Sequence, residues 1–185
     1  MPKKGQTLRN PISGDTYEFL ETAQDSNGER VSIKATVISR GKLLPNHFHV
    51  LQDETFEVLS GTMTFWLDGK TFTLSKGEKI TIPKNTPHNH YHVDDFAVSY
   101  LYTVTPALDF DYFIENLVGL AADGKSTKGS YGFIQVLVSL KYLEGKTYLA
   151  DVPIWLQKLL MNIIAPIARY FGYRAIYKKY SGFEK

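Results

Sequence analysis

The side chains best suited to chemistry in this sequence are its histidines. All five lie in one stretch of 46 residues, at His47, His49, His88, His90 and His92. Neutral imidazole is a common metal ligand and also transfers protons near neutral pH. A single histidine on a strand is more often structural than a ligand, so the spacing of these five decides what they predict.

The spacing predicts a metal site built from several strands. His47 and His49 are two residues apart, so in a strand both side chains point to the same face. Glu54 begins the next predicted strand and His88 begins a later one, so three imidazoles and one carboxylate can converge on one ion. Imidazole suits Zn, Fe, Ni and Cu, and a carboxylate adds affinity for Mn or Fe. We therefore expect one divalent transition metal ion, whose identity these ligands leave open.

The elements that must position these side chains are short strands. Residues 30–38 alternate apolar and polar side chains, and a turn cluster at 25–28 separates them from 17–21, which predicts a hairpin. Asp68-Gly69 between two β-type runs is a strong signal for a two-residue hairpin. Further runs of β-type residues lie at 47–51, 54–60, 62–67, 70–74, 78–82, 88–93 and 96–104. Many short strands with frequent turns indicate a sandwich or a barrel.

After about residue 105 the hydrophobic period changes to that of helices. We expect a helix over 110–122 with Asp109 as its N-cap, a second over 131–143, and a third that starts near Pro153 and ends before Gly172. The sequence therefore divides into a β-barrel, residues 1–105, and a helical extension, residues 106–185. That extension is predicted to pack on the barrel or at a dimer interface.

Residues 152–171 are apolar enough to be compared with a membrane helix. Lys158, Asn162 and Arg169 fall on one helical stripe within them. A central charge costs roughly 2.5–3.5 kcal/mol on insertion into a bilayer, which argues against a transmembrane span. We expect an amphipathic helix that covers the barrel or a second subunit, with a membrane surface as the alternative. Because closed two-fold dimers are the commonest assembly, we expect a homodimer.

The composition excludes several classes of protein. Hydrophobic residues make up 43% of the chain and charged residues 22%, which are globular values and argue against disorder. The net charge of +2 argues against a dedicated nucleic-acid binder. Cysteine is absent, so disulfides and thiolate ligands are excluded, and the first ten residues lack an apolar run typical of a secretory signal. These features favour a cytoplasmic protein.

Two spaced motifs resemble the signature motifs of the cupin superfamily. The first is Gly41, five residues, His47-Phe48-His49, four residues, Glu54, six residues and Gly61. The second is Gly77, five residues, Pro83, four residues and His88. The resemblance implies a mainly β fold, a cupin jelly-roll β-barrel with a C-terminal α-helical extension. It also implies that His47, His49, Glu54 and His88 hold the metal.

The sequence departs from the cupin pattern at two positions. Asn85 stands where the second motif usually has Gly, and Asn tolerates the left-handed turn that this position needs. His92 stands where the motif usually ends in Asn. In a regular strand His88, His90 and His92 face the interior together. His90 and His92 either hydrogen-bond inside the pocket, or one of them acts as a proton shuttle or alternative ligand.

The resemblance also suggests which residues surround the metal. Side chains on the same strand faces as the ligands are expected to line a pocket, namely Phe56, Val58, Phe65, His92, Tyr100 and Tyr102. His90 and Glu54 are the candidates for catalytic roles.

The chain is similar to the small quercetinase-like cupins, in which a metal and a neighbouring acid or base act on a flavonol or another enolisable aromatic molecule. This favours a metal-dependent, dioxygenase-like oxidoreductase acting on a small molecule. A non-catalytic binding or sensing cupin and a metal-dependent isomerase stay open as alternatives, because the fold alone does not select the activity.

Overall fold

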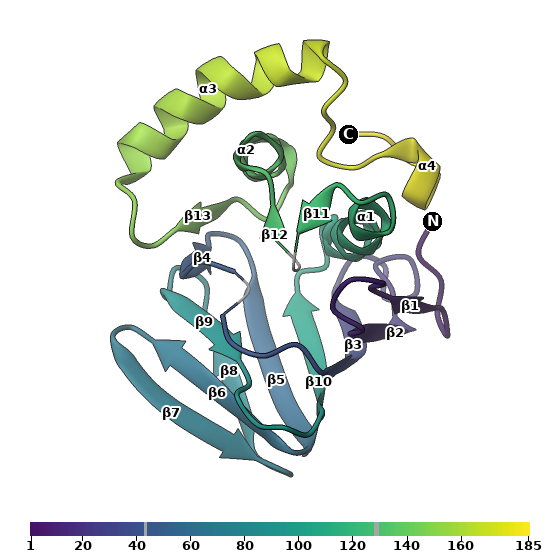
Figure 1. Ribbon diagram of the computed structural model, residues 1–185, viewed down its shortest axis with the longest axis vertical. Helices are drawn as coiled ribbons and strands as arrows, with labels where there is room; N and C mark the ends of the chain where they lie inside the picture. Colours follow the sequence, from purple (N-terminus) through teal and green to yellow (C-terminus); the bar gives the residue numbers. More distant parts are fainter. Residues whose placement is uncertain (43, 128–129) are drawn as a thin grey trace.

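Two antiparallel sheets form the barrel in the computed structural model, which describes residues 1–42, 44–127 and 130–185 (Figure 1). The larger sheet has the strand order β1-β2-β3-β10-β5-β8. Its strands are β1 Thr7–Arg9, β2 Thr16–Glu21, β3 Val31–Val37, β10 Val98–Thr105, β5 Asp53–Ser60 and β8 Lys79–Ile82. The smaller sheet has the order β13-β4-β9-β6-β7. Its strands are β13 Thr147–Leu149, β4 His47–His49, β9 His88–Tyr91, β6 Thr62–Leu67 and β7 Lys70–Ser75.

The predicted hairpins are confirmed, and their turns explain the register. β6 and β7 pair through Asp68 and Gly69, whose φ angles of 44° and 85° are both in the left-handed region. A two-residue turn of this type matches the twist of the flanking strands. Asn85 has φ 64°, the left-handed conformation expected from the sequence, and its backbone N–H donates to the carbonyl of His49 at 2.7 Å. This turn therefore connects the second motif directly to the strand that carries His47 and His49.

The barrel core contains the alternate, inward-facing residues of both sheets. Phe19, Ile33, Phe56 and Phe65 are completely buried, and Val104 joins them at the end of β10. This period of two is the pattern that the sequence showed for residues 30–38. The mainly β fold with C-terminal helices agrees with the expected architecture.

The helices are α1 Phe110–Ala122, α2 Phe133–Tyr142, α3 Ile154–Tyr170 and the short α4 Lys178–Ser181, and a small ribbon joins β11 Ser126–Thr127 to β12 Ser130–Tyr131. Figure 1 shows α1 and α2 above the barrel and α3 outermost. Asp109 is the N-cap residue of α1, as expected, but its carboxylate makes no capping hydrogen bond to the helix. It accepts instead from the backbone N–H of Glu144 at 3.0 Å and from the Lys185 ammonium at 2.9 Å.

Four short strands were missed in the sequence, namely β1 and β13 in the barrel sheets and the two-residue strands β11 and β12. β1 has three residues, and β13 has three residues within the segment assigned to helices. β13 pairs with β4, so the extension adds a strand to the smaller sheet of the barrel. Among the described residues, no helix combines the length and the apolar character needed to cross a bilayer.

Candidate metal centre

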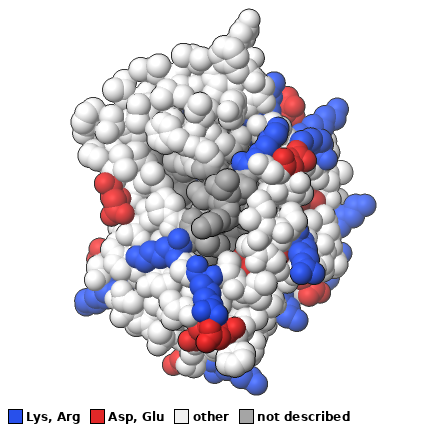
Figure 2. Space-filling model, in the orientation of Figure 1, with Lys and Arg blue, Asp and Glu red and all other residues white. Residues whose placement is uncertain are grey.

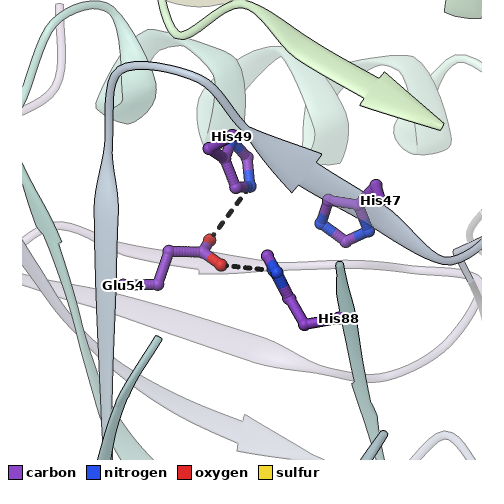
Figure 3. A group of neighbouring side chains, drawn as sticks. All are labelled: His47, His49, Glu54 and His88. Atoms are coloured by element: carbon purple, nitrogen blue, oxygen red, sulfur yellow. Dashed lines mark ion pairs between the residues drawn. The ribbon is translucent and has the colours of Figure 1, made fainter. Parts of the chain in front are cut away.

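Three strands bring the four predicted ligands together at one end of the barrel. His47 and His49 lie on β4, Glu54 is the second residue of β5, and His88 is the first residue of β9. β4 and β9 pair with His47 opposite His88. One ligand atom from each of the four side chains lies within 4.8 Å of the others, and Figure 3 shows all four pointing to a common centre.

Glu54 is the link between the histidines in this arrangement. Its Oε2 lies 2.6 Å from His88 Nε2, and its Oε1 lies 3.2 Å from His49 Nε2 (Figure 3). The Tyr102 hydroxyl also donates to Oε1. His47 makes no ion pair with Glu54 in the described structure, and its ring centroid lies 4.6 Å from that of His88. Three nitrogens and one carboxylate therefore surround a small space.

Each of the three cluster histidines has a polar contact at Nδ1, on the side of the ring that faces away from the cluster. His47 Nδ1–H donates to the carbonyl of Pro45 at 2.9 Å, and His88 Nδ1–H donates to that of Thr86 at 2.8 Å. His49 Nδ1 lies 2.9 Å from Thr147 Oγ1. For His47 and His88, whose partners are carbonyl oxygens, Nδ1 must carry a proton, and in the neutral ring this leaves the Nε2 lone pair free to bind a metal.

The pKa values of His47, Glu54 and His88 depend strongly on one another. Burial, together with His49 and His88, lowers the pKa of His47 to about 3. Burial opposes ionisation of Glu54, but His49 and His88 hold the pKa of its carboxyl well below the usual range. Glu54 in turn raises the pKa of His88, against the effect of burial. The carboxylate is therefore ionised, and His47 is neutral at working pH.

The residues present fit one divalent transition metal ion. The Nε2 atoms of His49 and His88 and Oε2 of Glu54 are buried and, apart from their ion-pair contacts, lack hydrogen-bond partners among the described residues. Buried polar atoms without partners are uncommon in native structures and need an explanation. A bound ion would satisfy all three atoms, and imidazole with carboxylate is a donor set that transition metals accept.

A cavity of about 230 Å³ opens beside the cluster. His47, His49 and Glu54 lie on its wall with His90, Tyr100 and Tyr102. The opposite wall comes from the extension and is mostly apolar, with Phe110, Phe113, Ile114 and Leu117 from α1 and Val136, Leu140 and Leu143 from α2 or its C-terminal end. The helices therefore form a roof over the open end of the barrel.

Only some of the predicted pocket residues line this cavity. Tyr100 and Tyr102 do, whereas Phe56, Val58 and Phe65 are at most 1% exposed and pack in the core below it. The Phe56 ring stacks on Tyr102 with ring centroids 4.5 Å apart. These three residues share the interior face, as expected, but the cavity is lined instead by Tyr102 and His90, whose rings pack against Phe56.

His90 and His92 lie in different surroundings. His90 lines the cavity, 4.7 Å from the Phe56 ring, and its Nδ1 is buried without a partner among the described residues. Burial lowers the pKa of His90 to about 4. His92 follows the end of β9, is buried and does not line the cavity. β9 ends at Tyr91, so the alternation assumed from the sequence does not extend to His92.

The helix faces that cover the cavity and the contact of Thr147 with His49 were not identified from the sequence. The helices that carry the roof were expected, but which face of α1 and α2 lies on the barrel depends on tertiary packing. Thr147 lies in a strand of three residues, too short for a periodic signal. Tyr17, at the start of β2, also lines the cavity and carries no motif.

Comparison with known proteins agrees with this site. Residues 36–104 match the family profile described as "Cupin domain". These residues include β4, β5 and β9 with all four candidate ligands, so this segment of the chain is a cupin domain.

Two curated proteins are distant relatives. The quercetin 2,3-dioxygenase of Bacillus subtilis is 28% identical over 106 residues, which cover 57% of this chain and 31% of that protein. The oxidoreductase iacF of Pestalotiopsis fici is 29% identical over 140 residues, which cover 69% of this chain and 68% of that protein. The chain thus spans about a third of the length of the Bacillus protein. Among solved structures, KdgF from Halomonas has a TM-score of 0.46 and 16% identity, over 54% of this chain and 84% of that one.

Proposed function

We propose that the protein is a metal-dependent oxidoreductase, similar to a dioxygenase, that acts on a small neutral aromatic or enolisable molecule. The observation that carries this proposal is a cluster of three histidines and one glutamate beside an apolar cavity, with His47, His49 and Glu54 on the cavity wall. A transition metal ion held there would supply Lewis-acid chemistry and, if redox-active, electron exchange with O₂. The two curated relatives are named as a dioxygenase and an oxidoreductase, which also supports this class of reaction.

The lining of the cavity supports a neutral substrate. No Lys or Arg is among the described residues that line it. Its acidic members are Glu54 in the cluster and Asp109, which Lys185 already neutralises. A phosphate or carboxylate group on the substrate would have no side-chain counter-ion and would lose its hydration on entry. Of the reactions open to a metal-dependent isomerase, this argues against those whose substrate carries a phosphate group.

His90 is the residue we assign to proton transfer. Its lowered pKa, about 4, keeps the imidazole neutral at pH 7, so that it can accept a proton from a phenol or enol hydroxyl in the cavity. Burial raises the pKa of Tyr100 well above its ordinary value, so that its hydroxyl stays protonated and can donate a hydrogen bond to a substrate oxygen. Glu54 would supply one negative charge to the metal ion, and its Oε1 accepts a hydrogen bond from the Tyr102 hydroxyl.

Oxygen uptake tests the proposal. Protein loaded separately with Fe²⁺, Mn²⁺, Ni²⁺, Cu²⁺ or Zn²⁺ is mixed with a panel of flavonols and simpler phenols. Uptake of one O₂ per molecule consumed supports a dioxygenase. His90→Ala should retain the metal and lose most of the turnover, whereas His92→Ala, which removes a buried histidine outside the cavity, should keep its turnover while folded.

A different outcome identifies the alternative function. If panel compounds raise the melting temperature of the metal-loaded protein without O₂ uptake or product, the chain is a binding or sensing cupin. Unchanged turnover in His90→Ala would remove the proton-transfer role of that residue and leave the activity itself standing.

A further inference from the structure

The Nδ1 atom of His49 contacts the C-terminal extension, whereas those of His47 and His88 contact neighbouring residues of the barrel. His47 and His88 both donate from Nδ1 to a carbonyl two residues earlier in the chain. His49 has no such local partner in the described structure. Its Nδ1 lies 2.9 Å from Oγ1 of Thr147, 98 residues later.

Strand pairing brings Thr147 to this position. β13 pairs antiparallel with β4, with Thr147 opposite His49 and Leu149 opposite His47. Backbone hydrogen bonds continue on both sides of the paired residues, from Val50 N–H to the Lys146 carbonyl at 3.2 Å and from Ala150 N–H to the Asn46 carbonyl at 2.8 Å. The register that places Thr147 on His49 is therefore fixed along the whole of β13.

The outer edge of β13 is held as well. The buried carboxamide of Gln157, in the first turn of α3, accepts from Leu149 N–H at 2.9 Å and donates to the Leu149 carbonyl at 2.9 Å. The carboxamide makes the two backbone hydrogen bonds that a further strand would make to Leu149. β13 is thus clamped between β4 and α3, which lets a three-residue strand hold one hydroxyl in a defined place.

We propose that Thr147 is a positioning residue of the metal centre. Its hydroxyl accepts the Nδ1–H of His49 and so presents the Nε2 lone pair of that residue to the ion. A hydroxyl both donates and accepts, so it can also remain bonded to the other tautomer, which a carbonyl cannot. Partners of this kind change metal affinity about 10–100-fold when they are removed. The proposal rests on the metal centre assigned above and not on the reaction.

Co²⁺ binding by the full-length chain, measured against a competing chelator, tests the proposal. Thr147→Val keeps the shape of the side chain and removes the hydroxyl, and we expect its dissociation constant for Co²⁺ to rise about 10–100-fold. Thr147→Ser restores the hydroxyl and should bind Co²⁺ close to wild type. Thr36→Val is the matched control, because it removes a threonine hydroxyl hydrogen-bonded to Ser99 at 2.8 Å on another sheet.

Two further measurements separate positioning from general damage. The metal-free melting temperatures of Thr147→Val and Thr36→Val should be similar, since each loses one side-chain hydrogen bond. In the Zn²⁺-loaded wild type, the imidazole nitrogen shifts of His49 should show the proton on Nδ1.

Two results would overturn the assignment in distinguishable ways. If Thr147→Val binds Co²⁺ as tightly as Thr36→Val, Thr147 has no positioning role and the metal centre stands. If the wild-type chain binds no Co²⁺, the metal centre and the role of Thr147 are both wrong.

Discussion

His47→Ala separates metal binding from folding more cleanly than any other change at this site. His47 is half-buried, makes no ion pair with Glu54 in the described structure, and is neutral because its pKa lies near 3. Among the described residues, the imidazole of His47 makes one hydrogen bond, to the Pro45 carbonyl. Removing the ring therefore takes no charge from the metal-free protein and costs about 0.5–1.5 kcal/mol for that bond.

The effect on the metal-bound state is larger. At a metal concentration one hundred times the dissociation constant, binding stabilises the folded state by about 2.7 kcal/mol. For a chain of 150–250 residues that is a rise in melting temperature of about 5–11 °C. If the loss of one ligand raises the dissociation constant a hundredfold, the same metal concentration stabilises by only about 0.4 kcal/mol, a rise of about 1–2 °C.

Differential scanning calorimetry with and without Co²⁺ measures both effects. We expect His47→Ala to melt within a few degrees of wild type when metal-free and to lose most of the Co²⁺-dependent rise. His88→Ala provides the contrast, because its loss leaves buried Glu54 without the partner at 2.6 Å and should also destabilise the metal-free protein. A Co²⁺-dependent rise in His47→Ala as large as in wild type would refute the reasoning.

Three other predictions concern the core, the pH dependence and the assembly. Phe56→Ala removes a completely buried ring and should cost about 3–5 kcal/mol in urea denaturation, while the metal stoichiometry stays the same; a cost below about 1 kcal/mol would mean that the ring lines a pocket after all. Burial raises the pKa of Glu115, so the stability from its protonated form is present at low pH and is lost as the pH rises through the folded pKa. Glu115→Gln should therefore gain stability relative to wild type between pH 4 and pH 7, and a constant difference would contradict this. The homodimer stays a prediction. Trp155, Leu159 and Ile163 lie on an exposed apolar face of α3, and Figure 2 shows few charged side chains over that end of the molecule. Ile163→Glu should convert a dimer to a monomer in light scattering, whereas a wild-type monomer that binds anionic vesicles would point to the membrane alternative.

The arrangement of the metal cluster could be predicted because it depends on local rules. The two-residue spacing of His47 and His49 sets a common face in any strand. The turns at Asp68-Gly69 and Asn85 need left-handed backbone, which these residues tolerate. That Glu54 and His88 join these two histidines was implied by the resemblance to the cupin motifs, and the four side chains do lie together.

The surroundings of the cluster could not be predicted in the same way. Phe56 and Tyr102 both face inward, and only the relative size and depth of their rings decides which one reaches the cavity. Asp109 has the sequence of a cap, but Lys185 and Glu144 compete for its carboxylate from distant positions. Thr147 carries no local signal because its role arises from a pairing with β4 across the chain.

X-ray absorption spectroscopy of the metal-loaded protein, together with its metal content, tests the central claim most directly. The account predicts one ion per chain with three imidazole nitrogens and one carboxylate among its ligands. It also predicts that the imidazole count falls to two in His88→Ala wherever metal is retained. A wild-type ion with fewer than three imidazoles, or an imidazole count unchanged in His88→Ala, would contradict the assignment of His47, His49, Glu54 and His88 as the metal centre.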